Sequence, residues 1–192
     1  FVLSFFIIKN LDINFLTYTV LIGSAFFLFF ITVRDFFMKN SSNLSQKIAH
    51  LGFSLLILSI LFNNIFSKEI ITNLKVGETF MSNNFKISFE NIEQFNESNF
   101  RVIKGKFRIE NSNGKTDFLN PELRIYDQPN IVTSEADIKT NLFLDKFMTM
   151  NYVQNQEYFN IRYQIKPFMI WIWFSVILIS FGGLISFIKK KI

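Results

Sequence analysis

Hydrophobic residues in this chain are concentrated in three blocks that are separated by more polar sequence. The blocks cover residues 15–33, 48–66 and 168–188, and none of them contains Asp, Glu, Lys or Arg. A helix needs roughly 20 apolar residues to cross the hydrocarbon core of a bilayer. A buried helix of a water-soluble protein is the alternative interpretation of each block, but such a helix normally has a polar face. The pattern therefore predicts three transmembrane helices.

Residues 1–14 begin with a shorter apolar run, FVLSFFII, which is too short to cross a membrane as a helix. The run also lacks the basic start and the cleavage site of a signal peptide. We interpret residues 1–14 as the end of a truncated transmembrane helix, followed by a short outer loop. On this interpretation the chain is the C-terminal piece of a larger protein.

The region between the last two blocks, residues 67–167, is predicted to be rich in β-strands. Apolar and polar residues alternate with the period of a half-buried strand in residues 85–90, 103–109, 123–125 and 159–165. Asn113-Gly114 is typical of a hairpin turn. Residues 95–99 are typical of a loop, and residues 133–141 fit either a strand or one short helix. We expect five to seven antiparallel strands in a small sheet or an open barrel.

The net charge of +5 indicates how the helices are oriented. Residues 34–47 and the tail, residues 189–192, carry the whole excess of positive charge, whereas residues 67–167 contain equal numbers of basic and acidic side chains. Loops rich in Lys and Arg stay on the cytoplasmic side of a membrane. We therefore expect a multi-pass protein of the bacterial inner membrane, with residues 67–167 in the periplasm. No basic stripe with interleaved aromatic residues indicates a nucleic-acid partner.

The composition excludes several kinds of chemistry. The chain has no Cys, which rules out disulfides, thiolate nucleophiles and Cys-based metal sites. It has one His, which rules out a zinc site built from several histidines. No charged residue lies in the apolar blocks, which argues against a transporter or channel with a polar path. The sequence thus lacks the parts of a self-sufficient soluble enzyme.

The single histidine, His50, lies about three residues inside the second predicted transmembrane helix, residues 48–66. At 1.5 Å per residue this position is roughly 5 Å from the cytoplasmic end of the helix. One interpretation is an interfacial histidine with its polar tip among the lipid headgroups. The other is a neutral imidazole that binds a metal or a haem iron within a helix bundle. Gly52 could let a bulky planar group approach the backbone, or could serve helix packing.

Further candidates lie closer to the C-terminus. Trp171 and Trp173 begin the last predicted helix at its outer end, where they fit an aromatic belt at the membrane surface or a haem environment. Arg124, Arg162 and Lys166 could contact haem propionates, and Arg124 could instead contact a partner protein. The alternative is ordinary pairing with surface carboxylates in a region that has as many acidic as basic residues.

Several short strings occur in a distinctive order along the last three-quarters of the chain. They are Ala49-His50-Leu51-Gly52-Phe53, Asn120-Pro121-Glu122-Leu123-Arg124-Ile125-Tyr126, Thr133-Ser134-Glu135-Ala136, Lys166-Pro167-Phe168 with Trp171-Ile172-Trp173, and Gly182-Gly183. In this order and spacing they resemble the C-terminal part of the CcmF/NrfE family, the haem lyase subunits of cytochrome c maturation.

The resemblance implies a polytopic inner-membrane protein that receives haem from a haem chaperone and helps to attach it to the CxxCH motif of an apocytochrome c. It implies that His50 is an axial ligand of a haem b held between transmembrane helices. It also implies that the β-rich domain contacts the haem chaperone, or the thioredoxin-like and apocytochrome-presenting subunits of the maturation system.

The sequence departs from the family in ways that limit this expectation. The Trp-rich haem-binding loop, the outer histidines and the second haem b ligand belong to an N-terminal portion that this sequence lacks. We therefore expect that portion to be a partner, and no lyase activity from this chain alone. Leu123 stands where a basic residue is usual, and Phe159 where a Trp is common. The alternative function is a non-enzymatic, membrane-anchored scaffold in which His50 binds nothing.

Overall fold

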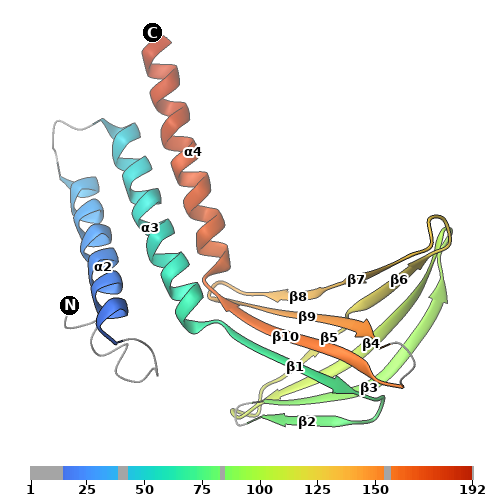
Figure 1. Cartoon of the computed structure of the whole chain (residues 1–192). Coiled ribbons are helices and arrows are strands. Elements are labelled where there is room, and N and C mark those ends of the chain that lie inside the picture. The colour runs from blue at the N-terminus through green and yellow to red at the C-terminus, as the bar shows by residue number, and fades with distance from the viewer. Residues whose placement is uncertain (1–14, 39–42, 83–84, 154–156, 192) are drawn as a thin grey trace. The chain divides into compact units, whose positions relative to one another are not determined.

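A computed structural model describes residues 15–38, 43–82, 85–153 and 157–191 (Figure 1). The predicted end of a truncated helix within residues 1–14 lies outside these described residues. The chain divides into two compact units. The helical unit contains the segments Phe1–Phe66, Leu142–Leu144 and Pro167–Ile192, and the strand unit contains Ser67–Asn141 and Asp145–Lys166.

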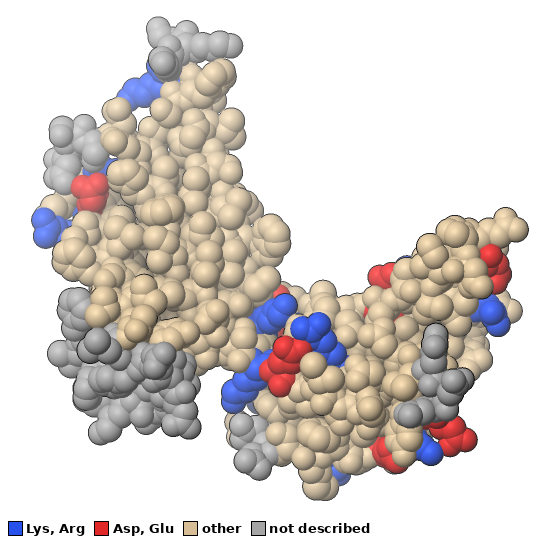
Figure 2. Space-filling view, viewed as in Figure 1, with Lys and Arg blue, Asp and Glu red and all other residues tan. Residues whose placement is uncertain are grey.

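The helical unit is built from three helices of 23 residues each. They are α2 (Phe15–Phe37), α3 (Leu44–Phe66) and α4 (Met169–Lys191). A helix of this length spans about 35 Å, which exceeds the roughly 30 Å of a bilayer core. Among the described residues, these three helices are long and apolar enough to cross a membrane. The visible body of the helical unit carries almost no charged side chains, in contrast to the strand unit (Figure 2).

Glycines allow α3 and α4 to pack closely. A Cβ atom on Gly52 of α3 would lie 2.9 Å from the Cβ of Leu178 and 3.0 Å from the backbone nitrogen of Ile179. A Cβ atom on Gly182 of α4 would lie 2.9 Å from the backbone nitrogen of Ala49. Because real Cβ atoms do not approach other atoms this closely, the two helices can meet here only through glycine.

A polar contact and an apolar cluster join α2 to α3. The hydroxyl groups of Thr32 and Ser54, both buried, are hydrogen-bonded to each other at 2.7 Å. At the other end of the pair, Ile22 packs with Ile65 in a small apolar cluster. The side chain of Lys47 is also buried, and its ammonium group donates a hydrogen bond to the carbonyl oxygen of Met38. The helix α3 thus begins before the predicted apolar block at residues 48–66 and includes a lysine.

The strand unit contains ten strands within the described residues. They are β1 (Lys68–Leu74), β2 (Thr79–Ser82), β3 (Phe85–Asn96), β4 (Phe100–Asn111), β5 (Thr116–Leu119), β6 (Glu122–Tyr126), β7 (Ile131–Glu135), β8 (Asp137–Thr140), β9 (Leu144–Tyr152) and β10 (Phe159–Pro167). One sheet has the order β1-β10-β9-β8. The other has the order β2-β3-β4-β6-β7, and β5 also pairs with β4. The pairs β1–β10, β2–β3, β3–β4, β4–β5, β4–β6, β6–β7 and β8–β9 are antiparallel.

The fold class is therefore confirmed: three long apolar helices and a β-rich domain between the last two. The expectation of five to seven strands in a single sheet or barrel was wrong, because β2, β5 and β8 have only four residues each and show no clear alternation. Residues 133–141 form strands β7 and β8 and no helix, and β3 continues to Asn96 within the predicted loop 95–99. The predicted hairpin turn is present, with Gly114 at a φ of 72°.

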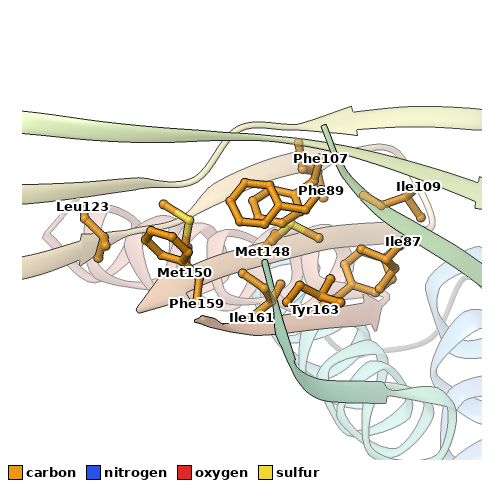
Figure 3. Close-up of a cluster of buried hydrophobic side chains, with 12 residues drawn as sticks. Ile87, Phe89, Phe107, Ile109, Leu123, Met148, Met150, Phe159, Ile161 and Tyr163 are labelled. Atoms are coloured by element: carbon orange, nitrogen blue, oxygen red, sulfur yellow. The ribbon is translucent and has the colours of Figure 1, made fainter. Parts of the chain in front are cut away.

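The core of the strand unit lies between the two sheets (Figure 3). The rings of Phe89 and Phe107, from β3 and β4, are stacked with centroids 4.2 Å apart. Met148 of β9 and Ile161 of β10 contribute from the other sheet, and both are fully buried. At about 25 cal/mol per Å² of apolar surface, such burial dominates the stability of a small domain. Each sheet therefore depends on the other for its buried face.

Candidate functional site

The structure places His50 in the second turn of α3, on a face that is open to solvent or lipid. It lines a groove with a volume of about 210 Å³ whose other wall is the end of α2. The α2 residues in that wall are Ile31, Thr32, Arg34 and Asp35. The groove therefore combines one imidazole, one guanidinium and one carboxylate with the apolar side chain of Ile31 and the hydroxyl-bearing side chain of Thr32.

His50 and Gly52 lie on different faces of α3. Successive helical residues are about 100° apart, so two positions separate these side-chain directions by roughly 200°. The face at Gly52 is filled by Leu178 and Ile179 of α4. The surface that Gly52 opens is thus used for helix packing, while His50 points away from that contact.

The donor set at His50 fits a haem better than a bare metal ion. Among the described residues, no three His, Cys, Asp or Glu side chains come together in a way that could hold a metal ion. A haem brings four nitrogen ligands of its own and needs only axial ligands from the protein. One exposed imidazole, an apolar wall at Ile31 and the cationic Arg34 are appropriate for one edge of such a group. The groove is smaller than a typical ligand pocket of roughly 300–1,000 Å³, so it would cover only that edge.

Arg124 lies in the strand unit, on β6, within a polar pocket of about 350 Å³. Its guanidinium lies 3.2 Å from the carboxylate of Glu122 and 5.3 Å from the ring of Phe100. Lys104 contacts the same carboxylate at 3.0 Å. Burial raises the pKa of Glu122, but the hydrogen bonds from Lys104 and Arg124 outweigh this effect and hold its pKa below the ordinary value. Arg124 is thus already paired within its own sheet.

The pocket brings together two of the strings that carry the family resemblance. Glu122 of β6 is in register with Glu135 of β7, and both line the pocket. The backbone N–H of Asn120 donates to the carboxylate of Asp137 at 2.6 Å, which closes the pocket beside Ala136. This juxtaposition depends on strand register, so the sequence alone could not reveal it.

The other basic candidates of the strand unit lie elsewhere. Arg162 of β10 is paired with Glu69 of β1, and Lys166 lies with its ammonium group 5.7 Å from the ring centroid of Phe147. Both belong to the four-stranded sheet, whereas Arg124 belongs to the other sheet. The structure therefore forms no cluster from these three basic residues.

Trp171 and Trp173 lie in the first two turns of α4. The indole Nε1–H of Trp171 donates to the carbonyl oxygen of Leu142 at 2.9 Å, and Trp173 is 65% exposed. Gly52 of α3 faces Leu178 of α4, and this contact fixes which positions of the two helices lie at the same height. At 1.5 Å per residue, Trp171 is level with a position of α3 that lies roughly 14 Å along the helix axis from His50. The structure thus does not bring these tryptophans to His50. The segment Leu142–Leu144, which contacts Trp171, was not identified from the sequence; a short apolar run between polar residues was its only signal.

Comparison with known families gives a clear result for the strand unit. A sequence model described as the CcmF C-terminal β-sandwich matches residues 65–167. This range covers β1 to β10 and the two sheets that enclose the core.

Several relatives are cytochrome c-type biogenesis proteins. The protein CcmF of Pseudomonas fluorescens is 27% identical over 146 residues, which are 76% of this chain and 22% of that protein. The CcmF protein of Haemophilus influenzae is 26% identical over 163 residues, 85% of this chain and 25% of its own length. The NrfE protein of the same organism is 23% identical over 168 residues, 87% of this chain and 26% of NrfE. The chain thus spans about a quarter of the length of these relatives.

The fold is also similar to a solved structure, that of the cytochrome c heme lyase CcmF. The TM-score is 0.66 at 14% sequence identity, over 95% of this chain and 32% of that one. The resemblance to CcmF/NrfE drawn from the short strings is confirmed by these matches. Since the family model covers more than half of the sequence, the chain belongs to the CcmF C-terminal β-sandwich family.

Proposed function

We propose that this chain acts in cytochrome c maturation as the C-terminal portion of a haem-handling lyase subunit, with His50 as an axial ligand of a haem b in the membrane. The observation that carries the proposal is the position of His50: the one histidine of the sequence lines an open groove between two helices long enough to span a bilayer. An ionisable side chain in such a helix is costly to bury and is therefore a functional candidate by default.

In this proposal His50 provides a neutral imidazole nitrogen, while Arg34 provides a positive charge for a carboxylate of the bound group. Ile31 provides an apolar surface. A bound haem would supply one-electron redox chemistry. The residues that would join haem to an apocytochrome CxxCH motif are not assigned to this chain, which spans about a quarter of its relatives.

We further propose that the protein lies in the bacterial inner membrane with residues 67–167 in the periplasm, between helices at 48–66 and 168–188. Residues 34–47 would form a cytoplasmic loop and residues 189–192 a cytoplasmic tail, since Lys and Arg predominate there. The strand unit would face the haem chaperone or the thioredoxin-like and apocytochrome-presenting subunits. The pocket around Arg124 would be the contact surface for such a partner.

The test is a haem titration of the purified chain in detergent, in which binding is monitored through the Soret absorbance. His50→Ala is compared with the parent and with Gln46→Ala, since Gln46 is exposed one helical turn before His50. We expect the parent and the control to bind alike, and His50→Ala to bind at least about tenfold more weakly, a difference of roughly 1.4 kcal/mol. Equal binding by all three proteins would refute the ligand role.

A membrane-anchored scaffold is the second candidate function. The paired charges of the Arg124 pocket and the two-sheet core would suit a protein-binding platform without a cofactor. A scaffold would bind no haem at any tested concentration, and its association with maturation subunits would be insensitive to His50→Ala. Haem content therefore separates the two functions.

A further inference from the structure

The turn between β8 and β9, together with the first residue of β9, belongs to the helical unit. Leu142–Leu144 is grouped with the helices, whereas the strand residues on either side belong to the strand unit. The turn packs on the beginning of α4, which is the end of a candidate membrane span at Met169–Lys189. Its depth along α4 is therefore that of the interface between lipid and water.

Two backbone carbonyl groups of this turn accept hydrogen bonds from residues at the beginning of the α4 segment. The indole N–H of Trp171 donates to the carbonyl oxygen of Leu142 at 2.9 Å. The backbone N–H of Phe168 donates to the carbonyl oxygen of Phe143 at 2.8 Å. Irregular backbone can enter an apolar environment only where its polar groups have partners, because an unpaired group in lipid is costly. These two carbonyl groups meet that condition.

The side chains of the turn are apolar and exposed. Leu142 is 55% exposed and Phe143 is 57% exposed. Leu142 also lines a wholly apolar pocket of about 220 Å³ together with Ile170, Trp171 and Phe174 of α4. Exposed apolar surface of this kind marks an interaction site.

The pocket continues into the exposed apolar face of α4. Trp173, Phe174 and Ile177 are exposed on the first three turns of this helix. Since α4 is long and apolar enough to span a bilayer, we expect lipid to be the medium against this face. The apolar surface of the turn is thus continuous with a lipid-facing surface.

We propose that Leu142–Leu144 is a membrane-inserted turn whose side chains, with Trp171 and Phe174, bind phospholipid near the carbonyl end of its acyl chains. The apolar pocket takes acyl-chain carbons, and the indole of Trp171 lies at the depth that amphipathic rings favour. The turn thereby fixes the connection between β8 and β9 at the membrane surface. This role is independent of haem binding at His50.

The absence of cysteine from the sequence allows a direct test. A single cysteine is introduced by Phe143→Cys, or by Leu142→Cys as a second site, and is labelled with an environment-sensitive fluorophore. The control is Val132→Cys on β7 of the strand unit, since Val132 has the same exposed fraction of 57% as Phe143. Each labelled chain is reconstituted into phosphatidylcholine nanodiscs in which some lipids carry a doxyl quencher near the carbonyl groups.

We expect the doxyl lipid to quench the label of the Phe143→Cys or Leu142→Cys chain at least about twofold more than that of the Val132→Cys chain, as interfacial residues contact that depth. Aqueous iodide should show the reverse order. Lipid quenching at both turn positions that is no greater than at the control would overturn the proposal, whether water or another protein segment covers the turn.

Discussion

Gly182 of α4 lies directly against the backbone of Ala49 of α3: a Cβ atom on the glycine would be 2.9 Å from the amide nitrogen of Ala49 and from its Cβ. His50 is the next residue of α3, so the contact fixes the backbone that carries the proposed haem ligand. Helices in membranes associate mainly through such close packing, because there is no hydrophobic driving force for helix association in lipid. The packing of α4 therefore determines the position of His50.

This contact predicts contrasting effects at adjacent glycines. Gly182→Ala should destabilise the helical unit by about 1–3 kcal/mol, the usual cost of overpacking, because backbone atoms of α3 cannot move aside locally. Gly183→Ala is the matched control, since a Cβ atom there would meet nothing within 4 Å. Thermal unfolding in detergent measures both variants. Equal unfolding temperatures for the two would contradict the assigned packing.

A buried hydroxyl pair predicts a smaller effect between α2 and α3. Ser54→Ala removes the 2.7 Å hydrogen bond to Thr32 and should cost about 0.5–1 kcal/mol, the range for such bonds in membranes. Ser180→Ala is the control, because the hydroxyl of Ser180 is exposed and bonds within its own helix. A double-mutant cycle with Thr32→Val measures the coupling. The absence of any coupling would show that the two hydroxyl groups do not interact.

The strand unit should lose stability in acid through Asp117. This carboxylate on β5 pairs with Lys146 of β9 and, at 3.5 Å, with Lys139 of β8, so it links the two sheets. The hydrogen bond from Lys146 is the main cause that lowers the pKa of Asp117 below its ordinary value of 3.8. Since the folded pKa is the lower one, the stabilisation is complete well above 3.8 and disappears as the pH falls through the folded pKa.

Asp117→Asn should therefore lower the free energy of unfolding at neutral pH by about 1 kcal/mol and flatten its decline in acid. Urea unfolding monitored across acidic and neutral pH measures the difference. Asp127→Asn, at an exposed aspartate after β6, provides the comparison. If Asp117→Asn retains the acid dependence of the parent, the ion pairs do not stabilise the link between sheets.

The sequence was informative where a pattern is local. Uncharged blocks near the length of a bilayer core identified all three described helices, and Asn113-Gly114 identified a hairpin. The start of α3 was harder to predict, because Lys47 is buried within this helix although a lysine beside an apolar block suggests a loop. Four-residue strands gave too few positions for alternation to be visible. The division into two sheets was not foreseen because it depends on long-range strand pairing, such as that of β1 with β10.

For the candidate sites too, the sequence shows single residues, whereas their surroundings depend on the fold. His50 could be selected because it is the sole histidine within an apolar block, but its groove depends on the packing of α2. The pocket at Arg124 depends on the register that pairs Glu122 with Glu135. The turn at Leu142–Leu144 can be identified as a candidate site only from the hydrogen bond that Trp171 donates to it. Each is a long-range relationship that no local pattern contains.

The most direct test of His50 as a haem ligand is chemical rescue of His50→Gly by imidazole in the protein whose N-terminal portion, the expected source of the second axial ligand, has been restored. The rescue is monitored in the visible spectrum of the ferrous, haem-loaded protein. We predict that the parent shows low-spin bands, that His50→Gly loses them, and that added imidazole restores them by occupying the vacated position. Gln46→Gly should keep the parent spectrum with or without imidazole. A low-spin spectrum that survives His50→Gly unchanged, or one lost and never restored by imidazole, would contradict direct ligation by His50.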